Sequence, residues 1–400
     1  MKEKESSTIS SFILKIISII FLFSLIITIV MKTKKNKENI ENIENKENKE
    51  NKENKENIEN KENKENIENK ENKKIGVVGI FHDNNAGNNL IKFSINTKLK
   101  EFGFDPVIIA LSSNNNIDFL EKHLKLKMIK TNFSELSEKD YDMLMVNSDQ
   151  TWNIMDMNNI EKLLNIGYLK FAENWTIHRF VYGASLGVDY WKYSRKFDTI
   201  ARRLLKKFSE ISVREIGTIE IAERHLGIRP ELVLDPTLII DKHYYLDLIK
   251  DFNITFNLNE KCLCFYQLDK NILIEKFVKD ASESFNYKIF KVNLQEEQFV
   301  ENFISCINNS NAVITDSYHG TLFSIIFEKP FITYINRVRG NSRFISLNRI
   351  FNLGPRIVNQ YNFRGVDINL LKKPLNINQT LLNDLKNKSI NFLKKNLKKK

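Results

Sequence analysis

The chain has 400 residues, of which 42% are hydrophobic and 28% charged, and its formal net charge is +11. This composition excludes a wholly disordered chain and is sufficient for one large or two ordinary globular domains. Three cysteines exclude a disulfide framework and require neither a structural metal nor an oxidising compartment. Residues 386–400 hold seven lysines and no acid. A terminal lysine run of this kind does not indicate a nucleic-acid-binding domain, so no nucleic-acid partner is expected.

The first 73 residues differ in composition from the rest of the chain. Residues 12–31 are apolar apart from Lys15 and small hydroxyl side chains, and their length predicts a retained transmembrane helix rather than a cleaved signal peptide. Residues 32–73 repeat Asn-Lys-Glu and Asn-Ile-Glu triplets, which predicts a charged, low-complexity stalk. A spacer that holds the body off a membrane and an expansion without a specific role are both consistent with this repeat.

The folded body is predicted to begin at Lys74. An apolar strand is followed by a turn-rich loop, by a helix over residues 90–104 and by a second strand over residues 106–111. This order is typical of a parallel α/β sheet with right-handed crossovers. The same lobe contains further strand patterns at residues 141–149, 178–187, 208–217 and 230–240.

A second set of alternating strands and helices begins near Lys261. Strand patterns at residues 261–268, 287–293, 312–317 and 330–335 alternate with helical patterns at residues 271–286, 296–310 and 319–329. This repetition predicts two Rossmann-like lobes, at residues 74–255 and 256–360, that face a central cleft where polar residues collect at strand ends. Residues 361–400 are expected to form a helical, lysine-rich tail.

The segment VITDSYHGTLF carries the sharpest local signal. A buried strand runs into Asp316 and Ser317, which are good helix-capping residues, and His319 and Gly320 open a helix that Thr321 continues. Backbone N–H groups, a hydroxyl and an imidazole then meet at one helix N-terminus, an arrangement that suits an anion such as phosphate. An ordinary capped turn with an incidental histidine is the alternative.

Seven sequence blocks lie in order between residues 74 and 356: AGNNLIKFSINTKLKEFGF, VNSDQTWN, YGASLG, SVREIG, VLDPTL, ITDSYHGTLFSIIFEKPFI and RGNSRF. Together they resemble the polysaccharide pyruvyl transferase family, whose usual form of the second block is G-S-D-Q-x-W-N. Asn147 stands where that family often has glycine. This larger residue is expected to crowd the loop before Asp149 and to affect the choice of acceptor.

The resemblance implies a two-lobed, GT-B-like enzyme. It also implies transfer of a pyruvyl group from phosphoenolpyruvate onto two hydroxyls of a sugar, which forms a cyclic ketal and releases phosphate. The expected partners are phosphoenolpyruvate as co-substrate and a glycan or lipid-linked saccharide as acceptor, with no cofactor. The scattered histidines show no metal-ligand spacing, so no metal is expected.

This chemistry requires a positioned acid, a base and a site that holds phosphate. His319 is the first candidate, either for proton transfer or for phosphate contact alone. Asp316 is expected either to orient the imidazole or to cap the helix, with capping favoured. Ser317, Gly320 and Thr321 are expected to bind the donor at the helix N-terminus.

Three arginines are further donor-binding candidates. Arg214 resembles the family arginine that faces the donor, and a guanidinium can bind a carboxylate or phosphate in bidentate fashion. A salt bridge with Glu215 or another acid is the alternative. Arg339 and Arg343 lie in a block that is expected either to line the cleft or to form a solvated loop.

The first lobe supplies the acceptor-side candidates. Gly87, Asn88 and Asn89 are predicted to lie in a loop before a helix, where the amides can bind sugar hydroxyls. Asp149 is a candidate base toward an acceptor hydroxyl. Trp152 is expected either to stack on a sugar or, more often for a tryptophan at a strand end, to pack in the core.

Two other functions fit the same predicted scaffold, since fold alone does not set the reaction. One is a glycosyltransferase that uses a nucleotide sugar, and the other is a catalytically inactive, membrane-tethered homologue. The chain is expected to be a single-pass membrane protein. Lysines flank residues 12–31 on both sides, so the positive-inside bias places the body in the cytoplasm only weakly, and the secretory-pathway lumen is the alternative.

Overall fold

The computed structural model describes residues 72–80, 85–110, 122–123, 127–130, 132–153, 159–252, 260–296, 298–336, 339–359 and 365–399. The predicted transmembrane helix and nearly all of the predicted stalk lie outside these residues and stay predictions. No helix within the described ranges is long and apolar enough to cross a membrane.

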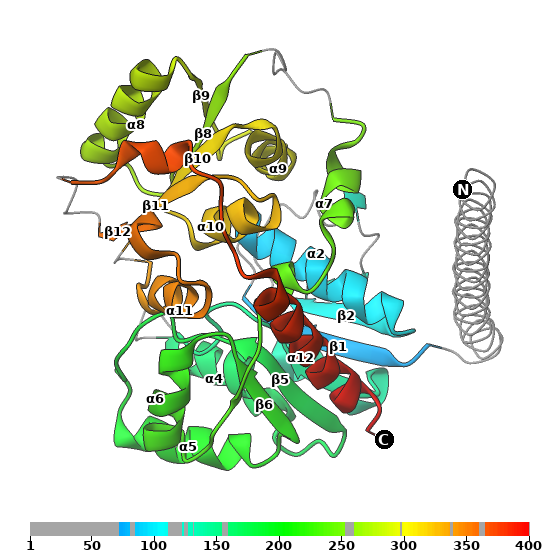
Figure 1. The fold of residues 1–400 in the computed structure, drawn as a ribbon. Coiled ribbons are helices and arrows are strands. Elements are labelled where there is room, and N and C mark those ends of the chain that lie inside the picture. The colour runs from blue at the N-terminus through cyan, green and yellow to red at the C-terminus, as the bar shows by residue number, and fades with distance from the viewer. Residues whose placement is uncertain are drawn as a thin grey trace, which may run out of the picture. The chain divides into compact units, whose positions relative to one another are not determined.

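The first lobe is built on a seven-stranded, all-parallel sheet in the order β3-β2-β1-β4-β5-β6-β7 (Figure 1). Its strands are β1 (Lys74–Val78), β2 (Asp105–Ala110), β3 (Lys127–Lys130), β4 (Met143–Val146), β5 (His178–Ala184), β6 (Glu210–Val213) and β7 (Glu231–Leu232). Strands β1 and β4 lie in the middle of the sheet and are almost wholly buried, as expected for a sheet covered on both faces. The 230–240 run, predicted as one strand, contains only the two-residue β7, because the Asp235 side chain caps a 3-10 helix that Pro236 opens.

The second lobe has a five-stranded, all-parallel sheet in the order β12-β11-β10-β8-β9. Its strands are β8 (Cys262–Tyr266), β9 (Lys288–Lys291), β10 (Ala312–Thr315), β11 (Phe331–Ile335) and β12 (Ile357–Asn359). The two sheets confirm the predicted α/β fold with two parallel sheets. Strands β3 and β12, at the edges of the two sheets, were not predicted.

Helices connect the strands and cover the sheets (Figure 1). The α-helices are α2 (Ala86–Glu101), α4 (Ile160–Tyr168), α5 (Arg195–Leu205), α6 (Ile216–Leu226), α7 (Lys242–Ile249), α8 (Ile272–Phe285), α9 (Phe299–Asn309), α10 (Tyr318–Ile326), α11 (Ser342–Phe351) and α12 (Gln379–Leu397). The 3-10 helices are η1 (Phe133–Glu135), η2 (Glu138–Asp140), η4 (Lys170–Ala172), η5 (Pro236–Leu238), η6 (Gly354–Arg356) and η7 (Ile368–Leu371).

One hydrophobic cluster extends across both lobes, because α2 of the first lobe packs against α9 and α10 of the second. An aromatic series crosses this contact. Phe93 of α2 lies 6.0 Å from Tyr245 of α7, Tyr245 lies 4.8 Å from Phe323 of α10, and Phe323 lies 5.2 Å from Phe303 of α9, measured between ring centroids. The two lobes therefore share a core and are not joined by a polar linker alone.

Two of the three cysteines form a disulfide within the second lobe. Cys264 of β8 is bonded to Cys306 of α9, with 5.6 Å between their Cα atoms. Cys262 is a buried free thiol on the same strand. The pair that is close in sequence is therefore not the pair that is bonded.

Helix α12 packs against the first lobe. The backbone N–H of Leu234 donates to Ser389 Oγ at 2.8 Å, and the buried ring of Phe392 lies 6.1 Å from that of Tyr182 on β5. Residues near the C-terminus thus cover the sheet that residues near Lys74 begin.

The lysines of the C-terminal segment, which were expected to form a basic tail, pair with acids of the first lobe and the α7 segment. This pairing neutralises part of the positive charge of the lysine-rich C-terminal segment. The ion pairs are Lys386–Asp241, Lys388–Glu231, Lys395–Glu210 and Lys399–Glu210.

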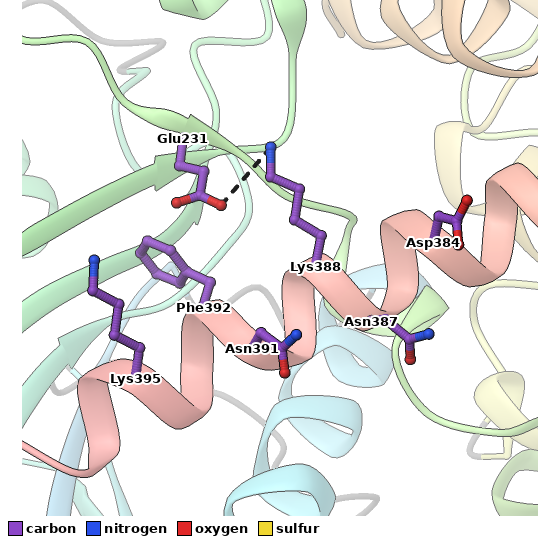
Figure 2. Close-up of a pocket in the computed structure, with 7 residues that line it drawn as sticks. All are labelled: Glu231, Asp384, Asn387, Lys388, Asn391, Phe392 and Lys395. Atoms are coloured by element: carbon purple, nitrogen blue, oxygen red, sulfur yellow. Dashed lines mark ion pairs between the residues drawn. The ribbon is translucent and has the colours of Figure 1, made fainter.

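A surface groove of about 420 Å³ lies between β7 and α12 (Figure 2). Lys388 reaches across it toward Glu231, with 3.8 Å between the charged atoms. Its lining residues are Glu231, Asp384, Asn387, Lys388, Asn391, Phe392 and Lys395. None of the residues expected to bind donor or acceptor lines this groove.

Candidate active site

Both sheets place carboxylates at the points where their strand order reverses, which is where open α/β sheets bind ligands. In the first sheet this point lies between β1 and β4, and Asp149 follows β4. In the second sheet it lies between β8 and β10, with Asp269 after β8 and Asp316 after β10.

Arg214, directly after β6, is at the centre of a buried polar cluster. Its side chain is fully buried, and its two terminal nitrogens donate to two carboxylates, one to Asp235 and the other to Asp149 at 3.0 Å. Asn88, in the first turn of α2, donates to Asp149 at 2.8 Å and to the carbonyl of Ile80 at 3.0 Å. The alternative given for Arg214, a salt bridge with Glu215 or another acid, is present, and the acids are Asp149 and Asp235.

The backbone of Asp149 has a φ of 94°, a conformation that residues other than glycine rarely adopt. A single β-bridge to Ala184 holds this position, and the N–H of Arg214 donates to the carbonyl of the same alanine at 3.3 Å. The surrounding structure thus maintains a strained residue at the site, which is where such strain is commonly found.

His319, in the first turn of α10, reaches this cluster from the second lobe. Its Nε2 atom lies 3.7 Å from Asp235, beyond hydrogen-bond distance. The imidazole of His319 also lies against Gly87 of α2, where an added Cβ would be 2.0 Å from His319 Nδ1. Gly87 therefore permits the close approach of the imidazole to α2, a role different from the predicted turn.

Two arginines, one from each lobe, lie by the ring of Tyr318. The guanidinium carbons of Arg214 and of Arg343, which lies on α11, are each 5.1 Å from the ring centroid, within the range of cation–π attraction. Within the described part of the chain, Arg214 Nε, Arg343 Nε and His319 Nε2 are buried and have no hydrogen-bond partner. The site thus holds three buried nitrogens without partners close to one aromatic ring.

The charges of the cluster set its protonation. Burial alone would raise the pKa of Asp149, but Arg214, His319 and Arg343, with the Asn88 hydrogen bond, lower that pKa to about 2. Burial also favours a raised pKa for Asp235, but the positive charge of Arg214 outweighs this effect and holds that pKa well below its usual range. Burial and the neighbouring Arg214 lower the pKa of Arg343. Both aspartates are therefore ionised at neutral pH.

Asp316 does not cap α10, as had been favoured, and does not contact the imidazole. It accepts hydrogen bonds from the backbone N–H groups of Leu268 at 2.7 Å and Asp269 at 3.1 Å, and from Asn336 at 3.3 Å. Burial raises its pKa, and these hydrogen bonds oppose the rise. The cap is Ser317, whose hydroxyl accepts from the N–H of Gly320 at 3.3 Å.

Several other predicted donor-site residues contact their own lobe. Arg339 forms a bidentate ion pair with Asp269, at 2.7 and 2.9 Å, and is partly exposed. The Thr321 hydroxyl is fully buried and bonded to the Ser317 carbonyl and the Thr333 hydroxyl. A Cβ on Gly320 would lie 2.5 Å from Thr315 Oγ1, so this glycine allows α10 to pack on β10. Donor binding by Arg339, Gly320 and Thr321 stays a prediction.

On the acceptor side, Trp152 packs in the core and not at a sugar site. It is fully buried, donates from its indole nitrogen to the Gly167 carbonyl at 3.1 Å and stacks on Tyr168 at 5.7 Å. Asn89, beside Asn88 in α2, is also buried. Asn147 is buried and accepts from the N–H of Ser148 at 2.8 Å, so its larger side chain stabilises the turn before Asp149.

Asp235 and Tyr318 were not predicted to be part of the site. Asp235 had a usable signal, since it is a carboxylate at a strand end in the VLDPTL block. Tyr318 stands between two predicted residues, yet nothing in the sequence separates a site tyrosine from a core one. Among the described residues, no group of histidine, cysteine, aspartate and glutamate side chains could hold a metal ion.

Solved structures share the fold at low sequence identity. A proposed UDP-N-acetylglucosamine 2-epimerase from Listeria monocytogenes is 11% identical with a TM-score of 0.51, and the match covers 82% of this chain and 96% of that one. A UDP-GlcNAc 2-epimerase from Neisseria meningitidis, bound to UDP-GlcNAc, is 9% identical with a TM-score of 0.50, over 81% and 99% of the two chains. At these identities the likeness shows the fold alone.

The family comparison is more specific. No curated protein sequence matches the chain significantly. The family model described as polysaccharide pyruvyl transferase matches residues 85–337, which is more than half of the chain and includes the clustered residues from Gly87 to His319. With the ordered blocks and the buried cluster that they form, this match shows that the chain belongs to the polysaccharide pyruvyl transferase family.

Proposed function

We propose that this chain transfers a pyruvyl group from phosphoenolpyruvate onto two hydroxyls of a glycan sugar, with release of phosphate. The observation that best supports the proposal is the set of three buried nitrogens without partners, on Arg214, Arg343 and His319. Buried N–H donors on guanidinium groups suit a small ligand that carries both a carboxylate and a phosphate. The phosphate and the carboxylate would each find a charged donor close to Tyr318.

The reaction balances without an oxidant or a cofactor. A proton adds to the terminal carbon of phosphoenolpyruvate, which becomes a methyl group, and one sugar hydroxyl attacks the adjacent oxocarbenium-like carbon. The bond between this carbon and the bridging oxygen of the phosphate then breaks, and the second sugar hydroxyl attacks the same carbon to close the ketal. The two sugar hydroxyls release two protons in total. One replaces the proton that was added to the methyl group, and the other leaves with the phosphate.

Charge and distance support different roles for Asp149 and His319 in the proposed reaction. A carboxylate with a pKa of about 2 is a weak base, so Asp149 is better suited to holding Arg214 and Asn88 than to accepting a hydroxyl proton. His319 is the proton-handling or phosphate-contacting group in this proposal, and its Nε2 atom lies 3.7 Å from the Asp235 carboxylate. The acceptor is a glycan or lipid-linked saccharide, and phosphoenolpyruvate is a co-substrate.

The test is phosphate release by the purified protein from phosphoenolpyruvate in the presence of galactose- or mannosamine-bearing acceptors. We expect wild type to release phosphate and to give a pyruvylated product by mass spectrometry, and His319→Ala to lose both. The matched control is His243→Ala, which removes an exposed histidine outside the cluster and should keep wild-type rates. Wild-type release no faster than that of His319→Ala, across a broad acceptor panel, would count against the proposal.

Ligand binding distinguishes the other two functions that fit the scaffold. A nucleotide sugar is named as the ligand of the Neisseria structure, and a nucleotide-sugar transferase should be stabilised against thermal unfolding by a nucleoside diphosphate. A pyruvyl transferase should be stabilised by phosphoenolpyruvate instead. An inactive, tethered homologue should release no phosphate whichever ligand it binds.

A further inference from the structure

Glu215 is a buried carboxylate that the proposed reaction does not use. It is fully buried, and it occupies the N-cap position of α6 without capping the helix. Three hydroxyls donate to it instead: Ser185, which follows β5, Thr218 of α6 at 3.1 Å, and Ser342 of α11 at 2.6 Å. Two of these donors belong to the first lobe, and Ser342 belongs to the second.

The bond from Ser342 to Glu215 therefore crosses between the lobes, and a second bond crosses beside it. The backbone N–H of Ile216 donates to Ser346 Oγ at 2.6 Å. Ser342 and Ser346 are four residues apart and so lie on one face of α11. The first two turns of α11 are thus held on the N-terminus of α6.

Each partner of the Glu215–Ser342 bond is next in sequence to one of the two arginines by Tyr318. Glu215 follows Arg214, and Ser342 precedes Arg343. Arg214 is fixed by two aspartates. Arg343 has no carboxylate within ion-pair distance among the described residues, and its terminal nitrogen donates only to the Arg339 carbonyl, at 2.5 Å.

Two buried guanidinium groups repel each other, so something must hold Arg343 near Arg214. The buried carboxylate of Glu215 is next in sequence to Arg214, and its bond to Ser342 acts on the backbone that carries Arg343. A charged acceptor strengthens such a hydrogen bond about twofold over a neutral one.

We propose that Glu215 is a positioning residue that, through Ser342, holds α11 of the second lobe against the first, so that the donor anion is bound by one arginine from each lobe. This inference rests on the proposed function and deepens it. On this proposal, the affinity for the donor depends on the hydrogen bond between Glu215 and Ser342, although neither residue contacts a substrate.

The test compares two variants that each remove one hydroxyl from the same carboxylate. Ser342→Ala removes the donor that crosses between the lobes, and Thr218→Val removes a donor within the first lobe. Losing a hydrogen bond to a charged group is expected to raise the KM for phosphoenolpyruvate about tenfold in Ser342→Ala, with kcat within about threefold of wild type. Thr218→Val should leave the KM unchanged, and Ser342→Thr, which keeps a hydroxyl, should restore it.

Hydrogen exchange provides a second measurement that needs no substrate. In Ser342→Ala, the amides of residues 342–351 should exchange faster than in wild type or in Thr218→Val. Equal exchange in the two variants, or an equal rise in KM, would overturn the positioning role. If the wild type does not turn over phosphoenolpyruvate, the proposed function fails, while hydrogen exchange still decides whether Glu215 holds α11.

Discussion

At the scale of single residues, two close contacts between the lobes depend on the absence of a side chain. Gly87 lies against the ring of His319, and Gly340, with a φ of 98°, lies against the backbone of Gly187 in the first lobe, where an added Cβ would meet the Gly187 carbonyl oxygen at 2.2 Å. Glycine permits both close approaches, and at Gly340 it also permits the left-handed backbone. The position of His319 therefore depends on the absence of a side chain at Gly87 as well as on its own polar neighbours.

Gly87→Ala is expected to displace His319 and to reduce turnover. The new methyl group would lie 2.0 Å from Nδ1 and 2.2 Å from Cγ of the imidazole, so the ring or α2 must move. A shift of about 1 Å at a reacting group can cost about a hundredfold in rate, and overpacking of this kind costs about 1–3 kcal/mol of stability. Phosphate-release kinetics and urea unfolding measure the two effects.

Gly217→Ala is the matched control. Gly217 is also in the first turn of a helix, but an added Cβ would meet nothing within 4 Å. This change should keep wild-type turnover and stabilise the protein by about 0.4–1 kcal/mol, because alanine restricts the unfolded chain. Wild-type turnover in Gly87→Ala would show that His319 is not required in its present position.

The sequence predicted residue types at the site better than it predicted their contacts. Arg214, Asp149, Asn88 and His319 come together as parts of one cluster, because strand ends and helix starts meet at the switch points of parallel sheets. Trp152 and Thr321 belong to the same blocks but point into the core. Which way a side chain faces after a strand end depends on packing partners distant in sequence, and the pattern of the block does not contain them.

At the scale of elements, α12 combines many lysines with apolar positions that pack on the first lobe, where Leu393 and Leu397 are buried beside Phe392. Strands β1, β2, β4 and β8 were predictable because they are continuous apolar runs flanked by turns. The edge strand β3, with the sequence KMIK, has no such signal, and only its pairing with β2 makes it a strand.

Phe392→Ala is expected to destabilise the protein by about 3–5 kcal/mol, since it leaves a cavity between α12 and β5. The ring is 3% exposed and lies 6.1 Å from that of Tyr182. Leu381→Ala, on the same helix but 36% exposed, should change stability by no more than about 0.5 kcal/mol. Equilibrium urea unfolding compares the two variants. Equal midpoints would mean that α12 does not stabilise the first lobe.

At the scale of the whole chain, the net charge of +11 has a different meaning from the one that composition suggests. Seven lysines gather in residues 386–400, but four lysines of that region pair with acids of the folded body. Exposed pairs of this kind are each worth at most about 1 kcal/mol, so they affect solvation and charge more than stability. A basic terminus that is packed in this way does not need a nucleic acid or a lipid surface to account for it.

Membrane attachment is therefore predicted from residues 12–31 alone. Twenty apolar residues are long enough to span a bilayer, so the full chain should remain in the membrane pellet after alkaline carbonate extraction, whereas a chain that begins at Asn72 should be released. Release of the full chain would contradict the anchor.

The side of the membrane can be measured with the sequons at Asn132 and Asn174, both of which are exposed. Phosphoenolpyruvate is a cytosolic metabolite, so a body that uses it is expected to face the cytoplasm and to show no glycosidase-sensitive change in mobility when expressed in eukaryotic cells. Asn174→Gln is the control, because it removes one acceptor without touching the cluster around Arg214. A glycosidase-sensitive shift in wild type that becomes smaller in Asn174→Gln would place the body in the lumen, where the donor would have to be imported for the proposed reaction to occur.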